Sequence, residues 1–197
     1  MILRPKVRVA SFALALAIPL SAAIAQPGEP PPEIAEKVKL CWTCHGEDGL
    51  PLVENVPIIA GQHMFYLLTQ LRDFRADRRA NDIMTPMAKE LSNDEMKALA
   101  TYFSEQPWPD YHEAASGADR GRAQMLAVEG ACTQCHLDRM LGDSRNPRVG
   151  RQKIDYTEKT LKDLRDNTRQ NAAAMAAIVR AWSDDDIAAM SRYLAGL

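Results

Sequence analysis

The chain has 197 residues, and its 26 Asp and Glu residues slightly outnumber its 24 Lys and Arg residues, for a formal net charge of −2. An acidic balance argues against binding to nucleic acid or to an anionic membrane surface. The length suits one ordinary domain or two small ones.

Residues 1–25 have the composition of a cleavable signal peptide. Three basic residues among the first eight precede an apolar run from Val9 to Leu20, and small residues lead up to a cleavage site after Ala25. The run is shorter than the roughly 20 residues that a helix needs to span a bilayer, and no later run approaches that length. We therefore predict export to the periplasm and no transmembrane segment in the mature chain.

Residues 26–106 are predicted to form a first domain. Apolar spacing predicts helices over residues 33–43 and 62–76. A capping box, Ser92 with Glu95, starts the last helix, because these side chains can satisfy free N–H groups of the first turn. No segment shows the alternation of apolar and polar residues that is typical of a strand, so we predict an all-α fold.

Residues 107–117 are predicted to be a linker, because two prolines surround Trp108 and small residues follow. Trp108 and Tyr111 are unusual in a free polar tether. We therefore expect the linker to lie along the surface where the two domains meet.

Residues 118–197 are predicted to form a second domain with the layout of the first. Helices are expected over residues 119–133 and 155–167, and a second capping box, Ser183 with Asp186, starts the last helix.

The two segments are related by duplication, since matched residues recur 90 or 91 positions apart. Both contain Cys-x-x-Cys-His: Cys41, Cys44 and His45 in the first, and Cys132, Cys135 and His136 in the second. Other matched pairs include Pro57 with Pro147, Gln62 with Gln152, Tyr66 with Tyr156, and Met84 with Met175. Repeats of this kind indicate two copies of one structural unit.

Cys-x-x-Cys-His is typical of covalent haem c attachment, in which two thiols add to the haem vinyl groups and the histidine binds the iron. A disulfide framework gives no reason for a histidine after both pairs. Zinc would need the two pairs some 15–20 residues apart, and they are much farther apart. A redox dithiol stays open as a minor alternative. The sequence therefore predicts two haems, with His45 and His136 as iron ligands.

Met84 and Met175 are the predicted ligands on the other face of each iron. Each follows its histidine by 39 residues, whereas Met87 aligns with Ile178 and has no counterpart in the repeat. A methionine ligand makes an iron site an electron-transfer site rather than an open one. Pro57 and Pro147 follow the histidines closely, and we expect each to place a carbonyl that accepts the ring N–H.

Other residues have weaker claims. His63 and His112 are expected at the surface or an interface rather than at iron. Two groups of arginines are candidates for contact with haem propionates, although a solvated helix face explains any single one equally well. They are Arg72, Arg75, Arg78, Arg79, Arg165 and Arg169. Tyr66 and Tyr156 are candidates for the same role or for core packing.

At these residues the chain resembles the dihaem cytochrome c4 group of class I c-type cytochromes. The stretches CWTCHG, PIIAGQHMFYLLTQLRDFRADRRANDIM and LSNDEMKALATYF carry the resemblance, as do their echoes in the second segment. The resemblance implies two tandem class I cytochrome c domains, each with one covalent haem. It implies thioether bonds at Cys41, Cys44, Cys132 and Cys135, and His/Met ligation of both irons.

Two positions depart from this pattern. Leu137 stands where the first segment has Gly46, and Arg151 stands where it has Gly61. We therefore expect different haem surroundings and different reduction potentials in the two domains.

The resemblance implies a periplasmic electron carrier, not an enzyme, that passes electrons from a respiratory donor to a terminal oxidase or reductase. The expected partners are redox proteins such as a membrane-bound oxidase or a quinol-oxidising complex. Two alternatives stay open: a haem-bearing subunit of an oxidoreductase, such as a flavocytochrome sulfide dehydrogenase, and a dihaem enzyme. The paired methionines argue against the enzyme.

Overall fold

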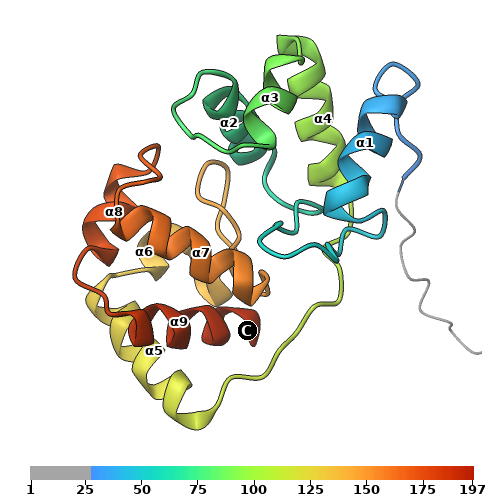
Figure 1. The fold of residues 1–197 in the computed structure, drawn as a ribbon. Helices are drawn as coiled ribbons and strands as arrows, with labels where there is room; N and C mark the ends of the chain where they lie inside the picture. Colours follow the sequence, from blue (N-terminus) through green and yellow to red (C-terminus); the bar gives the residue numbers. More distant parts are fainter. Residues whose placement is uncertain (1–27) are drawn as a thin grey trace, which may run out of the picture.

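The structure, a computed structural model, describes residues 28–197 and is helical (Figure 1). Within that range there is no β-strand, apart from one isolated bridge between Asp143 and Asn146. The all-α prediction is confirmed. The predicted signal peptide, residues 1–25, lies outside the described residues. No helix in the described part of the chain is long and apolar enough to cross a membrane.

The helices form two groups, here called the first half and the second half. The first half contains α1 (Ala35–His45), α2 (Met64–Arg75), α3 (Met84–Lys89) and α4 (Asn93–Glu105). The second half contains α5 (Gly117–Glu129), α6 (Thr133–His136), the 3₁₀ helix η1 (Asp138–Met140), α7 (Ile154–Arg165), α8 (Ala173–Val179) and α9 (Asp184–Ala195).

Each half has its own apolar core. In the first half α1 packs on α4 through Ile34, Val38 and Leu99, and α2 and α3 pack around Leu68 and Ala88. In the second half one cluster joins α5, α7, α8 and α9, with Ile187 completely buried at its centre. Both capping boxes are present as predicted, at the starts of α4 and α9. These cores fix the helices that carry the predicted site residues.

The structure corrects the predicted helix over residues 119–133. That helix ends at Glu129, because Ala131 adopts a left-handed backbone with φ of 49°. The chain then restarts as the short helix α6, which carries Cys135 and His136. In the first half, by contrast, α1 continues without a break through the whole motif to His45. The two motifs therefore have the same residue spacing, but the first lies on one continuous helix and the second on a separate short helix.

The two halves contact each other directly. The segment between α4 and α5 runs extended from one helix group to the other, and the loop of residues 141–153, light orange in Figure 1, projects from the second half toward the first. The Tyr66 amide donates to the Ser144 carbonyl at 3.1 Å. The Arg148 guanidinium stacks on the Trp108 ring, 4.1 Å from its centre. Trp108 also lies against the backbone of Gly61.

Candidate haem-binding sites

Both Cys-x-x-Cys-His motifs lie at the end of a helix, with the histidine in the last position. Helical geometry places residues three apart on neighbouring positions of one face, so both thiols of a pair point to the same side. All four cysteines are free thiols, and they are Cys41, Cys44, Cys132 and Cys135. In each motif, two thiols therefore lie on one side of the chain, next to a histidine at the end of a helix.

The two histidine rings are held by the same contact. The Nδ1 atom of His45 lies 2.9 Å from the Pro57 carbonyl oxygen, and that of His136 lies 2.9 Å from the Pro147 oxygen. Because a carbonyl only accepts, Nδ1 carries the proton and Nε2 is the basic nitrogen available to a metal. The predicted proline carbonyl contacts are confirmed.

Burial keeps both rings neutral. Each histidine is only 7% exposed. Desolvation lowers the pKa of His45 and of His136, and it outweighs the bond to the proline carbonyl, which acts in the opposite direction. A neutral imidazole with one free nitrogen is the form that binds iron.

The thiols fit haem attachment better than the alternatives. Burial raises the pKa of the Cys41 thiol to about 11, and it also raises that of Cys132. A redox dithiol needs a lowered pKa, because the thiolate is the nucleophile. Among residues 28–197, no group of three or more His, Cys, Asp and Glu side chains is arranged to hold a metal ion, as a zinc site would require. Paired thiols beside a free imidazole nitrogen suit a haem c group.

The predicted methionine ligands lie on two short helices that the sequence analysis did not predict. Met84 is the first residue of α3, and its amide donates to the Asn81 side chain at 2.8 Å. Met175 lies inside α8 and packs against the same core cluster as Cys132. Both helices have seven residues or fewer, too short for a clear apolar period. The capping contact has no counterpart before α8, where Ala172 occupies the Asn81 position.

The two departures from the repeat keep the backbone of a glycine. Leu137 has φ of 58° and ψ of −170°, a region that non-glycine residues avoid, and Gly46 also has a positive φ, of 80°. Arg151 has φ of 60°, close to the 66° of Gly61. The second half therefore holds two side chains in strained positions directly after its histidine and before α7.

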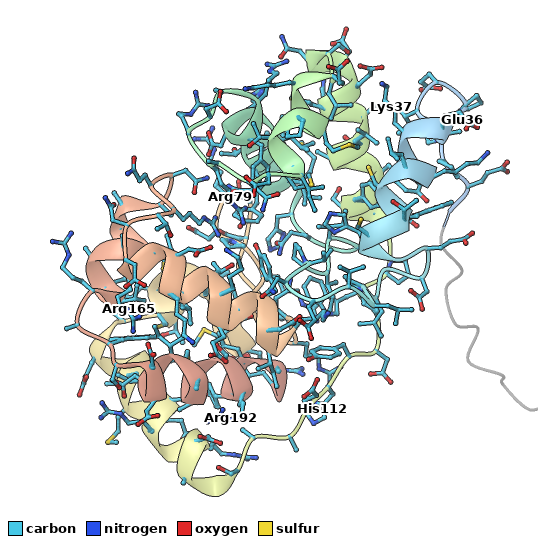
Figure 2. All side chains as sticks on the ribbon, viewed as in Figure 1. Glu36, Lys37, Arg79, His112, Arg165 and Arg192 are labelled. Carbon is cyan, nitrogen blue, oxygen red and sulfur yellow. The ribbon has the colours of Figure 1, made fainter. Side chains whose placement is uncertain are left out.

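Most of the candidate propionate contacts have other roles. Arg75 bonds the Leu91 carbonyl and Asn93, Arg78 pairs with Asp73, and Arg165 pairs with Asp166 and Asp184. Arg72 is exposed on α2. In Figure 2, Arg165 lies on the second half, whereas Arg79 lies where the halves meet.

Arg79 and Arg169 form a reciprocal pair of contacts between the halves. Arg79 donates to the Tyr156 hydroxyl at 3.1 Å, and Arg169 donates to the Tyr66 hydroxyl at 3.4 Å. Both guanidinium groups also bond the Gln70 side chain. Within the described residues neither arginine pairs with a carboxylate, although Arg169 is only 8% exposed. A buried cation of this kind fits an anionic group such as a haem propionate.

The positive charges of Arg79 and Arg169 affect the pKa of Tyr156. Burial alone would raise the pKa of its hydroxyl, but the adjacent Arg79 and Arg169 outweigh burial and lower it. The positive potential between the halves therefore favours an anion at this point.

The other two histidines do not join the motifs. His63 precedes α2, and its Nε2 atom lies 2.9 Å from the Leu141 carbonyl of the second half. His112 is exposed in the segment between α4 and α5 (Figure 2). His63 is thus an interface residue and His112 a surface residue, as predicted.

A pair of buried side-chain amides was not predicted from the sequence. Gln62 and Gln152 are 3% and 4% exposed, and both bond to backbone atoms of the opposite half. The repeat aligns them, but an uncharged side chain beside a helix start carries no signal for a contact between halves.

Comparison with known proteins gives consistent matches. The family model for cytochrome c oxidase, cbb3-type, subunit III matches residues 117–194. Cytochrome c4 of Thiocapsa roseopersicina is 37% identical over 187 residues, which cover 89% of this chain and 96% of the relative. A thiosulfate dehydrogenase electron acceptor of Stutzerimonas stutzeri (strain A1501) is 35% identical over 169 residues, which cover 80% of this chain and 78% of the relative.

A solved structure agrees with these sequence matches. The crystal structure of reduced recombinant cytochrome c4 from Pseudomonas stutzeri matches with a TM-score of 0.75 and 33% identity. The match covers 82% of this chain and 95% of the crystallised one. The similarity therefore extends over both helical halves.

Proposed function

The chain belongs to the cytochrome c4 family, and we propose that it is a periplasmic electron carrier in which each of two irons has one histidine and one methionine ligand. It is an electron-transfer cytochrome with two covalently bound haem c groups. The observation that carries the ligand proposal is the pair of buried rings, each with Nδ1 on a proline carbonyl and Nε2 free.

The proposed roles follow the repeat. Cys41, Cys44, Cys132 and Cys135 hold the two haems through thioether bonds. His45 and Met84 bind the first iron, and His136 and Met175 bind the second. The chemistry that haem supplies when bound is one-electron exchange between Fe(II) and Fe(III). Methionine ligation raises the reduction potential relative to bis-histidine sites.

Arg79 and Arg169 are the proposed propionate contacts, together with the tyrosine hydroxyls they bond. Their support is the burial of Arg169 and, for both, a positive charge that no carboxylate of the described chain neutralises. This assignment places the propionates between the halves. The protein would then hold both haems by the same interface that joins its domains.

Residues 26–106 and 118–197 form the two proposed haem domains, with residues 107–117 as the linker between them. Charge differs between the halves, with 14 acidic and 8 basic residues from position 26 to 110 but 12 acidic and 13 basic from position 111 to 197. Complementary charge on two redox partners mainly raises the rate at which they meet. The proposed partners are a redox donor and a terminal oxidase or reductase.

A second candidate function is supported by one comparison. The relative from Stutzerimonas stutzeri is a thiosulfate dehydrogenase electron acceptor. This chain would then be the haem partner of a thiosulfate-oxidising enzyme, whether it binds permanently or only for transfer.

One experiment tests the ligands and another separates the two functions. The oxidised holoprotein should show the weak far-red absorption of methionine-bound ferric haem, with an intensity for two sites. Met84→Ala and Met175→Ala should each remove half of it, and no loss in either variant would refute the ligand assignment. Stopped-flow reduction by thiosulfate dehydrogenase and oxidation by a membrane-bound oxidase then identify the partner.

A further inference from the structure

Gln62 and Gln152 form crossed contacts between the halves, and the peptide groups that they bind are the ones that hold the histidine rings. Gln152 of the second half accepts from the Ile58 amide at 2.9 Å and donates to the Ile58 carbonyl at 3.0 Å. Gln62 of the first half makes the same pair of bonds to Arg148, at 2.9 and 2.8 Å. Each side-chain amide thus binds the backbone of the opposite half through two bonds.

Ile58 and Arg148 directly follow the two prolines at the histidines. The Pro57 carbonyl and the Ile58 N–H belong to one planar peptide unit, whose atoms move together. His45 bonds the carbonyl side of this plane, and Gln152 of the other half bonds its N–H side. The orientation of the carbonyl at the ring is therefore fixed by a residue from the opposite half.

The bond from the Ile58 N–H to Gln152 also affects how strongly the Pro57 carbonyl accepts a hydrogen bond from His45. A peptide whose N–H donates a hydrogen bond is polarised and becomes a better acceptor at its oxygen. A stronger acceptor at Nδ1 makes the imidazole more basic at Nε2, which favours the ferric state of a bound iron. Ile58 is only 1% exposed, so water does not replace the amide of Gln152.

We propose that Gln152 is a positioning residue for His45, and Gln62 for His136, so that each half tunes the iron ligand of the other. This inference rests on the proposed histidine ligation. The inference also makes a claim that goes beyond the ligation. Substitution of a glutamine should change the reduction potential of the haem in the opposite domain, and not that of the haem in its own domain.

A local role for the glutamines predicts a different result. The Oε1 atom of Gln62 also accepts from the His63 amide, and that of Gln152 from the Lys153 amide, each at 3.0 Å. If these bonds to the next residue were the important ones, substitution would affect the helix that follows, α2 or α7, and the haem of the same half. The direction of the effect therefore separates the two explanations.

The test uses the full-length holoprotein with Gln152→Leu and Gln62→Leu as matched variants. Midpoint potentials of the two haems are measured separately by following the resolved NMR signals of each haem through a redox titration. For Gln152→Leu we expect the first haem to shift to a higher potential while the second stays in place. For Gln62→Leu we expect the reverse. Shifts in the same half as the substitution, or equal shifts of both haems, would overturn the proposal.

A second measurement reads the histidine directly. In the reduced state, exchange of the His45 Nδ1 proton with solvent should be about tenfold faster in Gln152→Leu, because two buried hydrogen bonds are lost. Exchange at His136 should not change. If the leucine variants do not fold, Gln152→Asn and Gln62→Asn keep a polar amide that is one carbon too short, and smaller crossed shifts are expected.

The outcomes also distinguish this inference from the proposed function. Normal far-red absorption and normal electron transfer, without crossed shifts, would refute the glutamine roles alone. A wild-type protein without methionine-bound haem would refute the ligand assignment, whatever the variants show.

Discussion

At the scale of single residues, Leu137 shows how the second site differs from the first. Its backbone conformation is essentially restricted to glycine, and its side chain is 41% exposed, so packing does little to offset the strain. The equivalent Gly46 has no room for a side chain, because a Cβ atom there would lie 2.4 Å from the Leu50 carbonyl oxygen. The duplicated site therefore kept a positive φ at this position, while the chain after it took a different path that leaves room for a side chain.

Leu137→Gly is expected to stabilise the holoprotein by about 1 kcal/mol, because it removes the strain and loses little buried area. The measurement is the free energy of unfolding by urea, monitored by circular dichroism. Gly46→Ala is the matched variant, and we expect it to destabilise the protein through the contact with Leu50. A destabilised Leu137→Gly would show that its side chain packs usefully.

At the scale of helices, most boundaries could be predicted, one local signal was overlooked, and the short helix α3 had no signal of its own. The capping boxes are local, so Ser92 and Ser183 marked the starts of α4 and α9 correctly. The break at Ala131 did have a local signal, because Gly130, the C-cap of α5, directly precedes it, and glycine is typical of helix ends. The position of Met84 depended on the repeat and not on periodicity, because α3 is too short to show any.

The capping box of α9 gives a prediction about pH. Asp186 pairs with Arg122 and accepts from the Ser183 amide, which hold the pKa of this carboxyl at about 2, below the ordinary 3.8. Since the folded pKa is the lower one, the stabilisation is complete above about pH 4 and is lost as the pH falls toward 2.

Asp186→Asn should therefore cost about 1 kcal/mol of folding free energy at neutral pH, and the difference from wild type should vanish near pH 2. Urea unfolding at a series of pH values checks this. Glu95→Gln in the first capping box is the control, with a smaller effect expected because the Glu95 side chain is 31% exposed and that of Asp186 only 10%. A difference that does not depend on pH would exclude the charge as the cause.

At the scale of the whole molecule, the sequence indicated two copies of one unit but not how they meet. The contacts of Gln62, Gln152, Arg79 and Arg169 connect residues 77 to 103 positions apart, and no local pattern distinguishes them from ordinary surface groups. The proposed haem ligands, in contrast, follow a fixed spacing within each copy, because each methionine lies 39 residues after its histidine. The repeat thus allows the ligand residues to be proposed from the sequence, whereas it gives no information about the contacts between the halves.

The buried arginines at this interface give a further prediction. Arg169→Met should lower the reduction potential of at least one haem by about 2 kcal/mol per electron, because loss of a nearby positive charge favours the ferric state. Redox titration of the holoprotein measures this. Arg165→Met is the control, because Arg165 already pairs with Asp166 and Asp184. The reduction potentials of both haems should stay unchanged in this variant. Equal shifts in both variants would exclude a specific role for Arg169.

The crossed contacts also bear on the ancestry of the chain. Gln62 meets Arg148 as Gln152 meets Ile58, and Arg79 meets Tyr156 as Arg169 meets Tyr66, so each contact is repeated with the partners exchanged. This is the geometry of an isologous interface, in which a surface patch pairs with its own copy around a two-fold axis. The two halves therefore meet as the subunits of a symmetric homodimer would, but because they are joined in one chain each half can change its sequence independently.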